Sequence, residues 1–407
     1  MNDLPDSTGP LDGVRVIELA HVMAGPVCGL MLADLGADVI KVERPAGDPT
    51  RKFVPPEQGG EAAAFLMLNR NKRGIALDIK NPDGRGALRR LLAEADVLIE
   101  NYRPGSLARL GLDYASLEPE LPQLVYCSIT GYGSSGPLAE EGGLDLVAQG
   151  YSGIMSITGE GGGRPPVKVG VPLTDIGAGI LAALGVTSAL HRRNQTGRGQ
   201  LVETSLFEAG LLTTFWQAAI ALASGESPGP MGSAHPLSAP YEAFRTTDGW
   251  ITLGTPTQTN WERLPDVLGM PELLDDARFA DNAGRLEHRQ ELVALVQNRL
   301  EQQSTKEWLA AMGAAGIPAG PVLSVGEALH HAQSTARNML THVEHPTAGR
   351  VPTIGPPIKL SESPASVRGP APLFGQHTRE VLREAHYEEA EIEAMLSSGA
   401  AIGSWPR

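Results

Sequence analysis

The chain has 407 residues, which is enough for two domains of ordinary size. Its composition, 42 % hydrophobic and 20 % charged, is typical of a globular protein, and its net charge of −14 argues against nucleic acid or an anionic membrane surface as a partner. Two cysteines are too few for a disulfide framework, and the ten histidines lack metal-ligand spacing, so no metal is predicted. The polar N-terminus does not resemble a signal peptide, and we expect a cytoplasmic protein without membrane contact.

The first part of the chain predicts a parallel α/β sheet. Val14–Leu19 and Asp38–Glu43 are short β-type runs, and between them a helical segment begins at Pro26 and ends at Gly36. A strand–helix–strand unit of this kind starts a parallel sheet. The loop His21–Pro26 has one glycine where the dinucleotide fingerprint needs three, so the nicotinamide cofactors are not predicted.

Further strands and helices alternate up to residue 223. The predicted strands are Gly74–Ile79, Asp96–Glu100, Gln123–Thr130 and Gln200–Ser205, and the predicted helices are Ala62–Leu68, Gly84–Glu94, a segment from Ile176 through Arg193, and the apolar run Phe207–Ala223. The last of these contains Glu208 and Gln217, so we expect a buried helix there and not a membrane span.

Cations gather where these strands end. In open α/β sheets, ligands bind beyond the carboxyl ends of the strands. Several cations at that edge of an acidic protein predict a polyphosphate ligand, held by charge-assisted hydrogen bonds. The residues that follow strand ends are Arg44, Lys80, Asn101 and Arg103, with Arg109 one helical turn further on. The separate run Asn69–Arg73 carries three cations and can also be a solvated charged surface, and this alternative stays open.

One acid stands out in the stretch Gly161–Asp175. Three glycines and a Pro-Pro pair precede a short apolar segment that ends at Asp175, and small apolar residues with helical spacing follow. Thr174 or Asp175 is expected to cap that helix, and a structural cap is one interpretation of this acid. The other is a nucleophile, because a carboxylate at a helix start stays ionised and can attack an activated carbonyl.

The middle of the chain predicts a second domain. Pro, Gly and Ser dominate residues 224–238, which we interpret as a linker. Beyond it, residues 241–254 predict a hairpin with Asp248-Gly249 as its turn, and helical segments follow. We therefore predict a large domain over residues 1–223, a small α+β domain over 239–330, and a return of residues 331–407 to the large domain.

These segments resemble the family III CoA-transferases, also called the CaiB–BaiF family, which include formyl-CoA transferase and the α-methylacyl-CoA racemases. The resemblance runs along nearly the whole chain, through LDGVRVIELAHVMAGP, NRNKRGIALDIKNPDGR, ADVLIENYRPG, PPVKVGVPLTDIGAG, TGRGQLVETSLFEA and GQHTREVL. It implies a Rossmann-like large domain built from both termini, an inserted small domain, and an interlocked homodimer.

The resemblance also implies an activity. The protein would move CoA from an acyl-CoA donor such as succinyl-CoA to a carboxylic acid, with CoA as a substrate and no tightly bound cofactor. Asp175 matches the catalytic aspartate, which in the implied ping-pong mechanism becomes an aspartyl anhydride and then an aspartyl-CoA thioester. Each attack needs backbone donors for an oxyanion, and Gly142-Gly143 and the Met231-Gly232 loop are candidates. The latter can also be a plain linker.

The implied CoA contacts are spread over the first 150 residues, mostly just after strands. Carried over position by position, they are Met23, Ala24, Arg44, Leu77, Lys80, Asn101, Tyr102, Arg103, Arg109, Gly143 and Leu144.

Departures from the family patterns narrow the activity. The racemases have a histidine where this chain has Leu144 and a glutamate where it has Thr257, and racemisation needs such an acid–base pair. A racemase is therefore the disfavoured alternative. A non-catalytic CoA-binding protein and a carnitine-type acceptor also remain as alternatives.

The pocket is expected to be larger and more apolar than one for formate or oxalate. Val54 and Ala64 replace aromatic residues of formyl-CoA transferase, and Met23 replaces its loop glutamine. This favours a short dicarboxylate such as succinate, itaconate or glutarate. Arg51 or Lys52 is a candidate to hold the distal carboxylate, although both can be surface cations.

Overall fold

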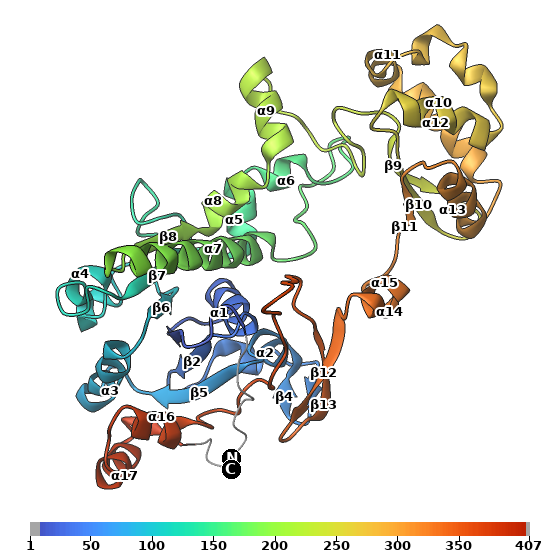
Figure 1. The fold of residues 1–407 in the computed structure, drawn as a ribbon. Coiled ribbons are helices and arrows are strands. Elements are labelled where there is room, and N and C mark those ends of the chain that lie inside the picture. The colour runs from blue at the N-terminus through green and yellow to red at the C-terminus, as the bar shows by residue number, and fades with distance from the viewer. Residues whose placement is uncertain (1–8, 404–407) are drawn as a thin grey trace. The chain divides into compact units, whose positions relative to one another are not determined.

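The structure is a computed structural model that describes residues 9–403 (Figure 1). The chain forms two compact units. The first unit takes in the chain up to Gly153, Val169–Thr213 and the part from Ala332 onward, and the second takes in Ile154–Lys168 and Thr214–His331. The second unit therefore includes Ile154–Lys168 and residues 214–223, which were predicted to lie in the large domain.

The first unit is built on a seven-stranded sheet with the order β14-β5-β2-β1-β6-β7-β8. All neighbouring strands are parallel except β14, which pairs antiparallel with β5 at one edge. The strands are β1 (Arg15–Glu18), β2 (Asp38–Glu43), β5 (Lys72–Leu77), β6 (Val97–Glu100), β7 (Val125–Thr130), β8 (Leu201–Ser205) and β14 (Ala401–Ile402). The predicted parallel sheet is confirmed, with strand boundaries within about two residues.

The strand order reverses at β1. The chain leaves β1 for β2 and β5 on one side, then returns to β6 on the other side of β1 and continues to β7 and β8. Val16 of β1 is in register with Val39 of β2 and Val97 of β6. The carboxyl ends of β1, β2 and β6 therefore meet at a topological switch point, where sheets of this kind bind ligands.

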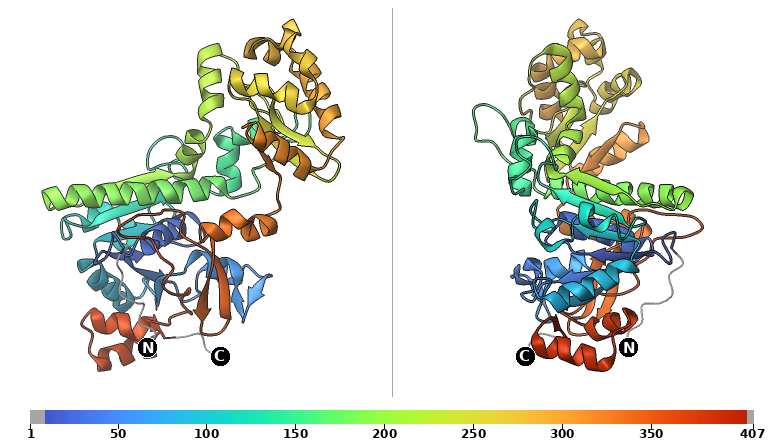
Figure 2. Two further views of the ribbon diagram at one scale, coloured as in Figure 1. Left: turned by 45° about the vertical axis from the view of Figure 1, so that its right-hand side comes forward. Right: turned by 90° about the vertical axis from the view of Figure 1, so that its left-hand side faces the viewer.

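Helices cover both faces of this sheet, because alternate strand residues are buried on opposite sides. Helices α1 (Ala24–Asp34) and α7 (Leu173–Thr196) pack on the face that carries Val16 and Val39. Helices α3 (Pro82–Ala93), α16 (Thr378–Glu384) and α17 (Glu389–Ser398) pack on the face that carries Ile17 and Ile40 (Figures 1 and 2). The length and composition of α7 would suit a membrane span, but its Ala178, Ala182 and Val186 are part of the core.

Helices α1 and α7 approach closely at Gly179. A Cβ atom at Gly179 would lie 2.6 Å from the carbonyl oxygen of Ala24, so a larger residue does not fit there. This contact brings the first turn of α7, which carries Asp175, next to the first turn of α1 at the switch point.

The predicted cap of α7 is wrong. The helix begins at Leu173, so Thr174 and Asp175 are its second and third residues, and Pro172 stands at the N-cap position without a side-chain cap. The physical reason is that a carboxylate from another helix takes the role of the cap, as described below. Asp175 therefore does not cap the helix, and the prediction of a structural cap is wrong for it.

The single buried helix predicted over residues 207–223 is also wrong. The segment forms two helices, α8 (Leu206–Leu212) and α9 (Phe215–Ser224), which belong to different units. The Thr213 hydroxyl, which donates to the carbonyl oxygen of Gly210, competes with helical hydrogen bonding at the break. No residue of α9 is buried. Its apolar composition indicated a helix, but composition does not show whether another surface covers that helix.

The second unit contains the predicted hairpin, formed by β9 (Tyr241–Arg245) and β10 (Trp250–Gly254). Strand β11 (Ala319–Pro321) completes an antiparallel sheet. Trp261 and Trp308 anchor its core. The helices around them are α10 (Gln258–Leu268), α11 (Asn282–Glu287), α12 (Arg289–Leu300) and α13 (Thr305–Ala314), and α6 (Ile154–Ile157) and α14 (Val325–His330) also belong to this unit.

The remaining elements of the first unit are short. They are β3 (Glu57–Gln58), β4 (Glu61–Ala62), α2 (Ala63–Leu68), α4 (Tyr114–Leu117), α5 (Asp145–Tyr151), α15 (Ala332–Ala336), β12 (Leu340–His345) and β13 (Gly349–Ile354).

Candidate active site

Three loops meet at the switch point and line two open cavities. The β1 loop is 20–23, the β2 loop is 44–52 and the β6 loop is 101–104. One cavity, of about 540 Å³, contains Asp175 and is called the Asp175 cavity. The other, of about 600 Å³, is called the Lys80 cavity. Arg44, Tyr102 and Ser106 line both, so the two cavities adjoin.

The structure gathers almost all of the predicted site residues into these two cavities. Those in the Asp175 cavity are Asp175, Ala24, Arg44, Asn101, Tyr102, Arg103, Gly143 and Leu144. Those in the Lys80 cavity are Arg44, Leu77, Lys80, Tyr102 and Arg109. Met23 lines neither cavity and stands at the N-cap position of α1. The contact of each residue with CoA stays a prediction.

Asp175 is a half-buried carboxyl group in the first turn of α7. Burial and the nearby charge of Asp145 raise its pKa from the ordinary 3.8 to about 7. The expectation that the helix start keeps this carboxylate ionised is therefore wrong at neutral pH, because the burial and the second acid outweigh the helix dipole. The ionised, nucleophilic form of Asp175 therefore predominates only at pH values above about 7.

Asp145 of α5 supplies the missing cap of α7. Its Oδ1 accepts hydrogen bonds from the backbone N–H of Thr174 at 3.0 Å and from the Thr174 hydroxyl at 2.8 Å. Its Oδ2 accepts from Gln149 Nε2 at 2.8 Å, and Gln149 Oε1 accepts from the N–H of Val169 at 2.9 Å. Asp145 and the fully buried Gln149 thus hold the backbone on both sides of the turn that leads to Asp175.

Two glycine-rich loops pack backbone to backbone beside Asp175. A Cβ atom at Gly143 would lie 2.3 Å from the Cα of Gly131, and both residues line the Asp175 cavity. The predicted donors Gly142-Gly143 are therefore in the same cavity as the carboxylate they are proposed to assist. Met231 and Gly232, the other candidate donors, belong to the second unit, and their role stays a prediction.

Asn101 links two of the three loops. Its Oδ1 accepts from the N–H of His21 at 3.0 Å, and its Nδ2 donates to the His21 carbonyl at 2.9 Å. The side chain of Asn101 therefore fastens the β1 loop to the β6 loop. This leaves its side chain with a structural task in addition to its predicted place beside CoA.

Other cations are taken up in internal ion pairs. The guanidinium of Arg51 binds both oxygens of Glu43 at 2.7 and 2.8 Å and lies over the ring of Phe65. Arg51 is thus neither a surface cation nor available to a substrate carboxylate, and both expectations for it are wrong.

In the run Asn69–Arg73, Arg70 and Lys72 are buried, so the solvated-surface alternative is wrong for them. A sequence pattern does not show which acids lie opposite a cation.

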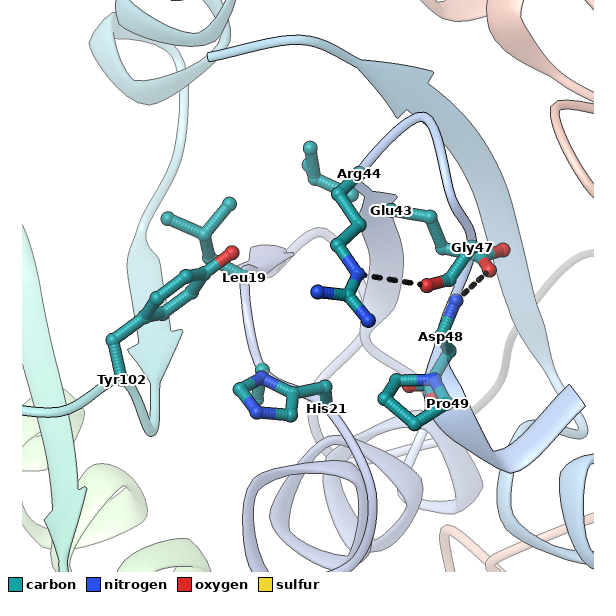
Figure 3. A pocket seen from close by; sticks show the side chains of 10 residues that line it. Leu19, His21, Glu43, Arg44, Gly47, Asp48, Pro49 and Tyr102 are labelled. Atoms are coloured by element: carbon teal, nitrogen blue, oxygen red, sulfur yellow. Dashed lines mark hydrogen bonds between the residues drawn. The ribbon is translucent and has the colours of Figure 1, made fainter. Parts of the chain in front are cut away.

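His21 is the site residue that the sequence analysis did not assign. It lies three residues after the end of β1 and lines the Asp175 cavity. Its ring lies edge-on to Tyr102, with 5.5 Å between ring centroids. Burial, together with Lys41 and Arg44, lowers its pKa, against an opposing effect of Asp48. His21, Arg44 and Tyr102 point toward one another around a narrow pocket of about 50 Å³ (Figure 3). The position of His21 after a strand end, like that of Arg44, is the sequence signal that could have identified it as a site residue.

Among the described residues, no group of His, Cys, Asp or Glu is arranged to hold a metal ion.

Comparisons with known proteins show what the chain is similar to. A sequence profile of CoA-transferase family III matches residues 11–378. The chain is 39 % identical to succinyl-CoA:glutarate CoA-transferase of Mus musculus, over 97 % of this chain and 91 % of the relative. It is 40 % identical to succinate–glutarate CoA-transferase of Agrobacterium fabrum, over 94 % and 98 %.

One similar solved structure is a CaiB/BaiF family protein from Brucella suis. It superimposes with a TM-score of 0.83 at 41 % identity, over 93 % of this chain and 99 % of that one. A more distant relative, acetyl-CoA:oxalate CoA-transferase of Acetobacter aceti, is 38 % identical over 87 % of this chain and 90 % of the relative.

Proposed function

The chain belongs to CoA-transferase family III, and from this premise we propose that it moves CoA from succinyl-CoA, or a similar donor, to a short dicarboxylic acid. The observation that carries the proposal is one carboxylate, Asp175, in a cavity that adjoins a cation-lined cavity at the switch point. The relatives named for succinyl-CoA and glutarate support dicarboxylates as the acids.

The two cavities suit the two ends of an acyl-CoA. The Lys80 cavity offers Lys80, Arg109 and Arg44, which match the charge of the CoA phosphates. The Asp175 cavity offers room for the thioester next to the nucleophile. Arg44 and Tyr102 line both and would lie beside the pantetheine arm that connects the ends.

The proposed mechanism proceeds through two covalent forms of Asp175. The ionised carboxylate attacks the donor thioester carbonyl, and the carbon–sulfur bond breaks to release CoA thiolate and leave a mixed anhydride. The thiolate attacks the aspartyl carbonyl, which gives aspartyl-CoA thioester and the free donor acid. The acceptor carboxylate then attacks this thioester, and the released thiolate attacks the acceptor carbonyl of the new anhydride. The products are acceptor acyl-CoA and free Asp175.

Each tetrahedral intermediate carries an oxyanion. Backbone N–H groups near the reacting carbon stabilise such a charge by about 2.7–4 kcal/mol per donor when they are held in place. The close packing of Gly131 on Gly143 supports a rigid loop at this position. We propose that the Gly142-Gly143 backbone has this role.

We also propose that the protein is a homodimer, and that its two chains interlock as the family resemblance implies. Several large apolar side chains of the first unit are exposed on α5 and the residue before it, on α7 and on α8, and surfaces of this kind mark protein interfaces. They are Leu144, Leu146, Val147, Tyr151, Ile180, Leu184, Leu211 and Leu212. Light scattering after gel filtration measures the mass, and a monomer at micromolar concentration would contradict this proposal.

The test of the function is an assay with succinyl-CoA as donor and a panel of carboxylic acids as acceptors, read by mass spectrometry. Glutarate and other short dicarboxylates are expected to become CoA thioesters, while Asp175→Asn produces none. Borohydride or hydroxylamine should trap the adduct on the Asp175 peptide. Turnover that survives in Asp175→Asn would overturn the mechanism. Exchange of the substrate α-proton for deuterium without an acceptor would instead favour the racemase, although Thr257 serves as the N-cap of α10 and offers no titratable group.

A further inference from the structure

A buried ion-pair network lies beneath the switch point and takes no part in the steps above. Its centre is Lys41 of β2, whose side chain is fully buried. Its partner Glu18 of β1 is also fully buried and contacts Lys72 as well. The free-energy cost of removing these charges from water is nearly as large as the attraction between them, so the network adds little to the free energy of unfolding. The contacts of Lys41 with the loops above it indicate a role other than stabilising the fold.

Lys41 connects two of the three loops that line the cavities. Its Nζ donates to the carbonyl oxygen of Ala20 in the β1 loop at 3.0 Å and pairs with Asp48 in the β2 loop at 2.8 Å. Asp48 in turn accepts hydrogen bonds from the N–H and hydroxyl of Thr50, at 2.8 and 2.6 Å. Despite the opposing effect of burial, Lys41 and Thr50 lower the pKa of Asp48 to about 2, so the pair stays charged. The β1 loop is thereby held against the β2 loop.

The third loop is tied to the same point. Asn101 of the β6 loop binds the backbone of His21, which follows Ala20 directly. The side chains that these tethers place are His21, Arg44 and Tyr102, which surround the narrow pocket of Figure 3. Because Arg44 and Tyr102 also line both large cavities, a change in the spacing of these loops would displace residues of both.

We propose that Lys41 is a positioning residue for CoA. It sets the distance between the β1 and β2 loops, so that His21 and Arg44 meet the bound CoA in a single arrangement. Lys41 lies in the wall beneath the site and acts only through the loops. This inference rests on the proposed function, since it takes CoA as the ligand of the two cavities.

The test compares CoA binding, measured by isothermal titration calorimetry, with thermal unfolding in three variants. Lys41→Met keeps the length of the side chain and removes its charge and donors. Lys41→Met combined with Asp48→Asn also removes the carboxylate that would otherwise be left buried without a cation. Arg70→Met is the matched control, because Arg70 is buried and pairs with Asp34 at 2.6 Å but contacts none of the three loops.

We expect the dissociation constant for CoA to rise about tenfold or more in both Lys41 variants, as displacement of positioning groups commonly does. Arg70→Met is expected to stay within about twofold of wild type, because distant sites act independently. The double variant should regain melting temperature relative to Lys41→Met without regaining affinity, since the Ala20 tether is still missing.

Wild-type affinity in a folded Lys41 variant, or affinity that returns with stability in the double variant, would overturn the positioning role. An equal loss of affinity in Arg70→Met would also overturn it, because it would show that general destabilisation is the cause. If the wild-type protein does not bind CoA, the proposed function itself fails, and this result is separate from any result with the variants.

Discussion

The carboxylate of Asp145 accepts hydrogen bonds from both the backbone N–H and the hydroxyl of Thr174, at 3.0 and 2.8 Å. Thr174 directly precedes Asp175, so one acid caps the turn that carries the other. The arrangement orients Asp175 and at the same time places a second negative charge near it, which contributes to the rise of its pKa to about 7. Geometry and proton affinity of the nucleophile thus depend on the same residue.

Replacing Asp145 by asparagine is expected to move the acid limb of the pH–rate profile to lower pH. Only the ionised form of Asp175 attacks, so the wild-type rate of the first half-reaction should fall as pH drops below about 7. Without the Asp145 charge the pKa of Asp175 falls toward its ordinary value, and the rate persists to more acidic pH. Rapid-quench measurement of adduct formation between pH 5 and 8 checks this shift.

Thr174→Val is the control for this experiment, because it removes the hydroxyl bond to Asp145 without changing a charge. It should lower the rate through poorer orientation and leave the midpoint of the profile in place. An unchanged midpoint in Asp145→Asn would show that burial alone sets the pKa of Asp175.

Asp175→Asn is expected to abolish turnover and to stabilise the fold at alkaline pH. The folded-state pKa of about 7 lies above the ordinary 3.8, so the protonated form of Asp175 favours the folded state. This stabilisation is present at low pH and is lost as the pH rises through 7 and the group ionises inside the fold. At pH 8 the uncharged variant should unfold with a free energy higher by about 1–2 kcal/mol, allowing for partial exposure of the site. Melting curves at pH 5 and pH 8 test this, and a gain at pH 5 but not at pH 8 would contradict the sign.

Two glycines of α7 are expected to respond differently to alanine. At Gly179 the new Cβ would lie 2.6 Å from the Ala24 carbonyl oxygen and force α7 away from α1, which displaces Asp175. At Gly177 it would make only an ordinary contact of 3.5 Å with Ala209. We expect Gly179→Ala to lose on the order of 1–3 kcal/mol of stability and much of kcat, and Gly177→Ala to keep both. Equal behaviour of the two variants would show that the helix contact does not position the site.

Removing the cations of the Lys80 cavity should weaken CoA binding in a salt-dependent way. Lys80→Ala and Arg109→Ala are each expected to raise the KM for acyl-CoA roughly five- to tenfold, since a charge-assisted contact is worth about 1–3 kcal/mol before solvent screening. The exposed Arg350 of β13 lies outside both cavities, so Arg350→Ala should leave KM unchanged and serves as the control. Initial rates at low and high salt give the KM values. An unchanged KM in both Lys80→Ala and Arg109→Ala would show that CoA binds outside the Lys80 cavity.

Much of the local structure follows from the sequence. The apolar β-type run at Asp38–Glu43 is a strand over the same residues, and the Asp248-Gly249 turn joins the two strands of the hairpin as predicted. The rule that ligands bind beyond strand ends led to Arg44, Lys80 and Arg103, and each of them lines a cavity at that edge. These features depend on neighbours in the chain, so a linear pattern is sufficient to predict them.

The environment of Asp175 and the fate of the cations follow from contacts between distant segments. Arg70 pairs with Asp34, 36 positions away, and burial together with Asp145, 30 positions away, raises the pKa of Asp175, although neither relation has a linear signal. In the same way, the apolar run after Ser205 indicated a helix but not its interruption at Thr213 or the absence of buried residues in α9. The sequence by itself determined which segments form strands and which residue types reach the switch point. Only the tertiary structure decided which of these charges are neutralised inside the protein, because pairing and burial depend on distances through space.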